Sequence, residues 1–137
     1  MDDVSLLRQF EDTSLPMEQW GHREHVKTAY LYLLNHSFDD AVAKMRTGLL
    51  AYNEAQNVPD ELTRGYHETL TQAWMRLVHV TLKLYGRCDT ADVFVDANSQ
   101  LLSMRALLLF YSRDRILSAE AKRGFIPPDL APLPAIN

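Results

Sequence analysis

Apolar residues recur at helical spacing along most of the chain and rarely alternate with polar ones. The clearest stripe begins at His67 and runs to Thr81 through five further residues: Leu70, Thr71, Trp74, Leu77 and Val78. Such a period is typical of one face of an α-helix, whereas a half-buried strand shows strict alternation. The pattern therefore predicts an all-α fold with little or no sheet.

Helix boundaries follow from the residues that interrupt this pattern. Glycine and proline lie between the periodic segments or at their ends, with Gly48 as the main exception, which favours helices joined by short turns. Gly48 costs its helix roughly 1 kcal/mol relative to alanine, so we expect a neighbouring helix to approach closely there. The predicted helices cover residues 3–12, 22–35, 37–57, 66–85, 90–97, 98–111 and 119–123, with a further turn at 16–20.

The last third of the chain contains two apolar segments of different kinds. Residues 98–111 are apolar nearly all round, which is typical of a central buried helix. Residues 126–134 contain four prolines and must be extended, and their apolar side chains predict that this tail packs across the bundle. We therefore expect a single domain, residues 1–137, built as an irregular bundle of about six or seven helices with an extended proline-rich C-terminal tail.

Composition and charge narrow the class of protein. The 137 residues are 47% hydrophobic and 23% charged, as in ordinary small soluble proteins. A net charge of −4 without a basic cluster predicts no nucleic-acid partner and disfavours a helix-turn-helix regulator. The longest apolar run, residues 106–111, is too short to span a bilayer, so we expect no membrane partner. An acidic N-terminus without signal-peptide features and a single cysteine, Cys88, predict a cytoplasmic protein.

Histidines begin the inward stripes of two predicted helices. His22 and His25 precede the apolar run of the helix at 22–35, and His67 begins the stripe of the helix at 66–85. Short connections make neighbouring helices antiparallel, so these two helices, separated by one other, should run parallel and start at the same end of the bundle. We therefore expect the three imidazoles to converge at that end.

The predicted cluster suits a divalent metal ion or, if no metal binds, an acidic small molecule held at the two helix ends. Helix N-termini disfavour positive charge and so bias histidine toward the neutral form that ligates metals and accepts protons. His22, His25 and His67 are the predicted ligands of Zn²⁺ or Fe²⁺. If the protein is an enzyme, Glu68 and His67 are the candidate catalytic groups, with Glu68 as general base. The candidate substrate-binding residues are Trp20, Tyr66 and Thr71.

The same residues also fit a protein without such a site. The i, i+3 spacing of His22 and His25 differs from the i, i+4 histidines of zinc metalloproteases and from the Glu-x-x-His of di-iron bundles. Buried histidines often only satisfy a backbone carbonyl or a tyrosine hydroxyl. The alternative is then a structural or protein–protein interaction module with a protein partner, including a homodimer, whose histidines are hydrogen-bonded core or end-cap residues. The residue pattern leaves both interpretations open.

Two stretches resemble a family of small bacterial proteins of unknown function. The first is Trp20-x-His22-x-x-His25, and the second is the Tyr-His-Glu-Thr-x-Thr stretch at residues 66–71, followed by Trp74. Met45-Arg46 and the ending from Tyr111 to Pro134 are similar to that family as well. The resemblance covers most of the chain, from about residue 20 to residue 134. It implies no particular activity, cofactor or substrate.

Overall fold

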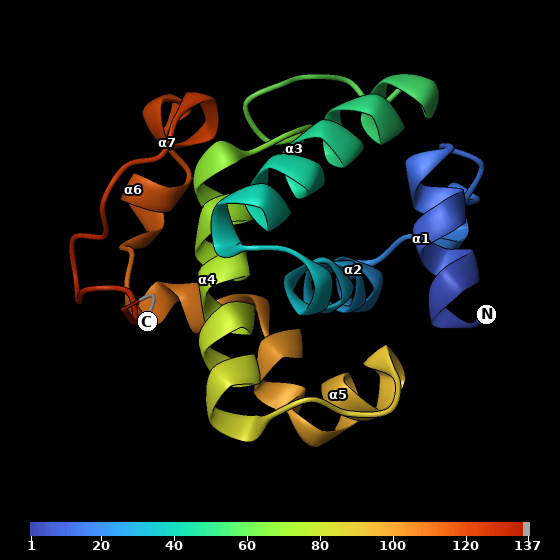
Figure 1. The fold of residues 1–137 in the computed structure, drawn as a ribbon. Helices are drawn as coiled ribbons and strands as arrows, with labels where there is room; N and C mark the ends of the chain where they lie inside the picture. Colours follow the sequence, from blue (N-terminus) through green and yellow to red (C-terminus); the bar gives the residue numbers. More distant parts are fainter. Residues whose placement is uncertain (136–137) are drawn as a thin grey trace.

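The computed structural model describes residues 1–135, which fold into a bundle of helices (Figure 1). Within these residues no strand forms, and one isolated bridge joins Glu61 and Arg64. The predicted all-α class is therefore confirmed. The α-helices are α1 (Asp3–Glu11), α2 (His22–Asn35), α3 (Phe38–Ala55), α4 (Glu68–Tyr85), α5 (Ala91–Ala97), α6 (Arg113–Ile116) and α7 (Ala119–Arg123). Three 3-10 helices join them: η1 (Met17–Gln19), η2 (Ser99–Leu102) and η3 (Met104–Leu109).

Helix α2 lies at the centre of the bundle, in contact with α1, α3, α4 and α5 (Figure 1). Its eight consecutive residues from Val26 to Leu33 are all buried, including the polar Lys27 and Thr28. A helix that is buried on every side must find partners for its polar groups inside the protein, because water does not reach them.

Residues 98–111 do not form the predicted central helix. They make the two 3-10 helices η2 and η3, separated by Ser103 in an extended conformation, and Met104 and Leu109 are 57% and 70% exposed. Leu101 packs in the core around α2, whereas Leu107 packs in a second cluster with the C-terminal residues. The segment therefore passes from one core to the other. A single straight helix would place its apolar side chains against only one of the two cores.

The second core attaches the C-terminal segment to α4. Its buried residues come from α4, η3, α6, α7 and the tail, and they are Ala73, Leu107, Tyr111, Ile116, Ala121, Ile126 and Leu133. The hydroxyl of Tyr111 donates to the carbonyl of Ile126 at 2.7 Å. Because Ile126 and Leu133 are buried, the prediction that the tail packs against the bundle is confirmed.

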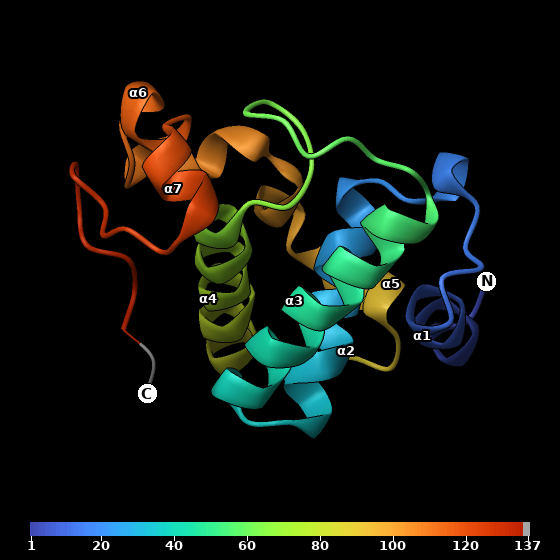
Figure 2. The ribbon, with the colours of Figure 1, turned by 90° about the horizontal axis from the view of Figure 1, so that it is seen from above.

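The starts of α2 and α4 lie on the predicted side, but the two helices cross and do not run parallel. In Figure 2, α2 and α4 begin at the same side of the molecule and α3 runs the opposite way, whereas in Figure 1 α2 is seen end-on and α4 runs down the view. The N-terminal ends of α2 and α4 therefore lie on one side of the bundle. The connection from α3 to α4, residues 56–67, crosses over this side.

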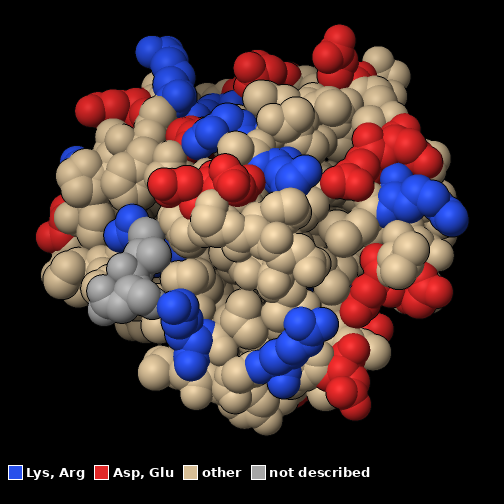
Figure 3. All heavy atoms as spheres, in the orientation of Figure 1, with Lys and Arg blue, Asp and Glu red and all other residues tan. Residues whose placement is uncertain are grey.

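The surface carries both signs of charge. On the face shown in Figure 3, lysine and arginine side chains are scattered among aspartate and glutamate and do not merge into a continuous basic area. In the part of the chain that the structure describes, no helix is both long enough and apolar enough to cross a membrane.

Gly48 permits the close approach predicted from its position. A Cβ atom at residue 48 would clash with the ring of Phe10, which belongs to α1. Gly48→Ala should lower the free energy of unfolding by about 1 kcal/mol, because overpacking of 1–3 kcal/mol exceeds the roughly 1 kcal/mol gained in helix propensity. Urea denaturation measures the change.

Two further variants show whether the effect comes from Phe10. Gly124→Ala is the control, since nothing lies within 4 Å of a Cβ there. In a Phe10→Leu background, Gly48→Ala should become neutral or stabilising. An equal loss in both backgrounds would contradict the contact.

Candidate ligand-binding pocket

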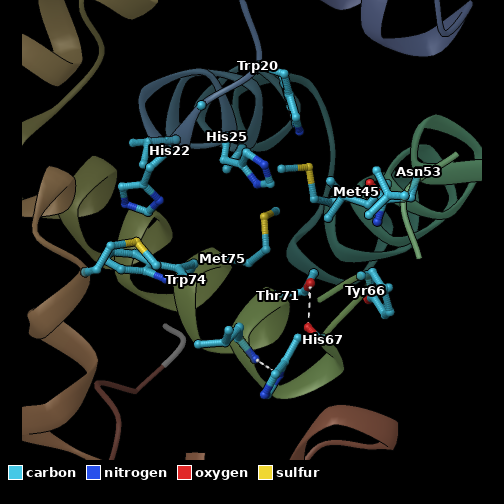
Figure 4. Close-up of a pocket in the computed structure, with 18 of the residues that line it drawn as sticks. Trp20, His22, His25, Met45, Asn53, Tyr66, His67, Thr71, Trp74 and Met75 are labelled. Carbon is cyan, nitrogen blue, oxygen red and sulfur yellow. Dashed lines mark hydrogen bonds between the residues drawn. The ribbon is translucent and has the colours of Figure 1, made fainter. Parts of the chain in front are cut away.

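A pocket of about 430 Å³ lies between the N-terminal half of α2, the middle of α3 and the first turns of α4 (Figure 4). Its walls include six of the seven residues predicted to form a site: Trp20, His22, His25, Tyr66, His67 and Thr71. Glu68 is the exception. The predicted convergence of the two helix ends thus places these residues around one pocket, although the roles of the individual side chains differ from the prediction.

His67 is the N-cap of α4. Its Nδ1 accepts a hydrogen bond from the backbone N–H of Leu70 at 3.0 Å, and its Nε2 donates to the carbonyl of Ile116 at 2.9 Å. These two bonds require the neutral tautomer with the proton on Nε2, and burial lowers the pKa of the ring. With both nitrogens occupied, His67 joins α4 to the C-terminal segment instead of serving as a metal ligand or a proton acceptor.

His22 is also held by a carbonyl. Its Nε2 lies 2.9 Å from the carbonyl oxygen of Leu101 and donates to it. The ring packs edge-on against Trp74, with centroids 4.6 Å apart. His22 therefore connects the start of α2 to η2.

His25 points into the middle of the pocket together with Met45 and Met75 (Figure 4). Its ring lies 4.3 Å from the ring of Trp20, centroid to centroid. No hydrogen bond to the His25 ring occurs within residues 1–135. Burial lowers the pKa of His25 to about 4, with a further contribution from neighbouring His22, so the imidazole is neutral at pH 7.

Glu68 turns away from the pocket and forms an ion pair with α3. The guanidinium of Arg46 donates two hydrogen bonds to it, at 2.8 Å and 2.7 Å, and the hydroxyl of Tyr66 and the amide of Gln72 also donate to it. These donors, with Arg46 the largest, lower the pKa of Glu68 to about 2. A carboxylate so strongly stabilised is a poor general base, and the geometry gives Glu68 a structural role in place of the predicted catalytic one.

The three histidines do not form the predicted metal centre. Among the described residues, no group of three or more histidine, cysteine, aspartate or glutamate side chains is arranged to hold a metal ion. The reason is that His22 and His67 direct their Nε2 atoms at the backbone carbonyls of Leu101 and Ile116, which do not line the pocket. The arrangement of the described residues thus gives no support to Zn²⁺ or Fe²⁺ bound to His22, His25 and His67, which stays a prediction.

The remaining predicted residues form parts of the pocket wall. The Tyr66 hydroxyl is directed to Glu68, and the Thr71 hydroxyl donates to the carbonyl of His67 at 2.9 Å. Trp20 stacks on Phe10 with centroids 4.7 Å apart, so one of its faces belongs to the core. Trp74 contributes an enclosed Nε1–H for which the described residues provide no acceptor.

Sequence reasoning missed the α3 side of the pocket. Met45, Leu49 and Asn53 line it at i, i+4 and i+8. Met45 and Leu49 follow the apolar stripe that the pattern assigned to the core, and nothing in the sequence distinguishes a stripe that faces a pocket from one that faces packed side chains. Asn53, one residue past the buried Tyr52, is the only polar residue among these three, and it was the only hint in the sequence that this side of α3 faces a pocket.

The connection between α3 and α4 closes one side of the pocket through Val58, Gly65 and Tyr66. Gly65 has a φ of +91°, where a Cβ would approach the carbonyl oxygen of Pro59 to 3.0 Å. The Lys122 ammonium of α7 donates to the carbonyl of Tyr66 at 2.7 Å and pairs with Asp60. This side of the pocket is therefore fastened to the C-terminal segment.

Comparison with known proteins adds no relative: no family model, curated protein or solved structure matches the chain. The resemblance to a bacterial family of unknown function stays a prediction. Function has to be argued from the pocket itself.

His25 should make stability depend on pH. Its pKa is about 4 in the folded chain and about 6.5 when unfolded, so the unfolded state binds the proton first as the pH falls. The resulting stability is present above pH 6.5 and is lost as the pH falls toward 4. Between pH 7 and pH 5 the loss amounts to at most about 2 kcal/mol.

Chemical denaturation of His25→Gln at several pH values measures this contribution. The variant should lose less stability than the wild type between pH 7 and pH 5. His36→Gln, at an exposed histidine after α2, is the control and should follow the wild type. Parallel curves for the wild type and His25→Gln would show that His25 is not buried in its neutral form.

Glu68 should contribute to stability through Arg46. Glu68→Gln should lower the free energy of unfolding by about 2 kcal/mol, because it weakens hydrogen bonds to a charged acceptor and leaves the guanidinium without its counter-ion. In an Arg46→Met background the same substitution should cost clearly less. Glu54→Gln, at an exposed position on α3, should change stability by no more than about 0.5 kcal/mol. Equal costs in both backgrounds would contradict the coupling.

Proposed function

We propose that the protein binds a small organic molecule in the pocket between α2, α3 and α4. The observation that carries the proposal is His25, a neutral imidazole that faces the pocket with no hydrogen-bond partner in residues 1–135. A polar group that faces an apolar pocket without a protein partner can give a ligand with a complementary group a hydrogen bond and fix its orientation.

The size and the walls of the pocket support the same proposal. A volume of about 430 Å³ lies within the range of small-molecule sites, which are mostly apolar with a few polar groups that fix orientation. The walls are mainly methionine, tryptophan, leucine and valine side chains. Methionine adapts its shape to a ligand, and the tryptophan rings add apolar contact area.

Binding without chemistry is favoured over catalysis. Of the two groups that we predicted as catalytic, Glu68 is held by Arg46 and His67 by Leu70 and Ile116. His25 alone would have to supply both acid and base. We therefore propose a ligand-binding protein and not an enzyme.

Intrinsic fluorescence can detect occupancy, because both tryptophans of the chain, Trp20 and Trp74, line the pocket. N-phenyl-1-naphthylamine, an uncharged aromatic probe, should quench or shift the tryptophan emission saturably as its own emission rises. Ala29→Leu should abolish this, since Ala29 lines the pocket and the longer side chain would project into it.

Ala73→Leu is the matched control. Ala73 is a fully buried alanine of the second core, does not line the pocket, and should lose about 1–3 kcal/mol of stability through overpacking. Ala29→Leu should lose less than about 1 kcal/mol, because space is present. Probe binding that survives Ala29→Leu unchanged would place the probe elsewhere and contradict the proposal.

A further inference from the structure

The pocket contains no charged side chain. No aspartate, glutamate, lysine or arginine is among the residues that line it. Tyr66 lines it as a neutral phenol, since burial raises the pKa of its hydroxyl to about 12. The Arg46–Glu68 ion pair adjoins the pocket wall through the Tyr66 hydroxyl, and each partner already neutralises the other. An ionised ligand would lose its hydration without meeting a counter-ion, which is costly in an apolar site.

The polar groups that remain available are neutral and lie at different places in the pocket wall, with His25 between Asn53 and Trp74 (Figure 4). His25 offers one N–H donor and one acceptor nitrogen, and the Asn53 amide has no hydrogen bond to the described residues. The Nε1–H of Trp74 is enclosed and lacks an acceptor in residues 1–135. Such groups can bind a hydroxyl or an amide and cannot balance a full charge.

Flat and polarisable surfaces surround these polar groups. Trp20 lies 4.3 Å from His25 and Trp74 lies 4.6 Å from His22, measured between ring centroids. Met45 and Met75 point into the pocket beside His25 (Figure 4). Sulfur and indole rings both favour contact with an aromatic ring.

We infer that the ligand of this pocket is an uncharged aromatic molecule that carries a hydroxyl or amide group hydrogen-bonded to His25. The inference rests on the proposed function and specifies its ligand class. His25 is a binding residue that selects the polar group, and Met45 and Met75 contact the ring.

Three compounds of similar size test the ligand class by isothermal titration calorimetry at pH 7: 2-naphthol, naphthalene and 2-naphthoate. Wild-type protein should bind 2-naphthol at least about fivefold more tightly than naphthalene, the equivalent of one net hydrogen bond. It should bind 2-naphthoate at least tenfold more weakly than 2-naphthol, because only the carboxylate is charged.

Two variants test the role of His25. His25→Phe keeps an aromatic ring and should bind 2-naphthol and naphthalene with equal affinity. His25→Gln keeps a neutral hydrogen-bonding side chain and should retain the preference for 2-naphthol. His36→Gln, at an exposed histidine outside the pocket, is the control and should leave the preference intact.

The outcomes separate the inference from the proposed function. Equal or tighter binding of 2-naphthoate, or a preference for 2-naphthol that persists in His25→Phe, overturns the inference and leaves small-molecule binding standing. Binding of none of the three compounds, together with no response to N-phenyl-1-naphthylamine, overturns the proposed function and the inference with it.

Discussion

The burial of α2 on every side is the constraint on which the polar contacts of this helix depend. Lys27 and Arg23 reach Asp92 on α5 at 3.0 Å and 2.9 Å, and the Tyr30 hydroxyl donates to the carbonyl of Cys88. Each contact ties a neighbouring segment to the central helix, because a buried polar group without a partner is costly. Two side chains of α2 remain without a partner among the described residues: Thr28, whose hydroxyl is enclosed, and His25, which faces the pocket.

On the other side of the pocket, Glu68 ties neighbouring segments together in the same way. It lies at the first residue of α4 and collects donors from α3 through Arg46, from the preceding loop through Tyr66 and from its own helix through Gln72. The low pKa of its carboxyl is a consequence of this arrangement. A perturbed carboxylate near a pocket can thus be a structural joint as readily as a catalytic group.

The helices could be predicted because a helix buried on one face has apolar residues at helical spacing in its sequence. The bounds of α2 were predicted to the residue, and the close approach at Gly48 followed from helix propensity alone. Residues 98–111 were mistaken for one helix because an apolar run carries no period, and only the presence of two cores explains the break at Ser103. The convergence of His22, His25 and His67 around a pocket followed from short connections, but their ring directions depend on carbonyls 49 and 79 residues away in sequence.

Those distant carbonyls explain why one histidine differs from the others. His22 and His67 lie at the margins of the pocket, where the last third of the chain passes and offers the carbonyls of Leu101 and Ile116. His25 lies one turn further into α2, where its neighbours are Trp20, Met45 and Met75, none of which presents a strong acceptor. The last third of the chain therefore provides hydrogen-bond acceptors for two of the three imidazoles. It leaves the third as the polar group that a ligand would have to satisfy.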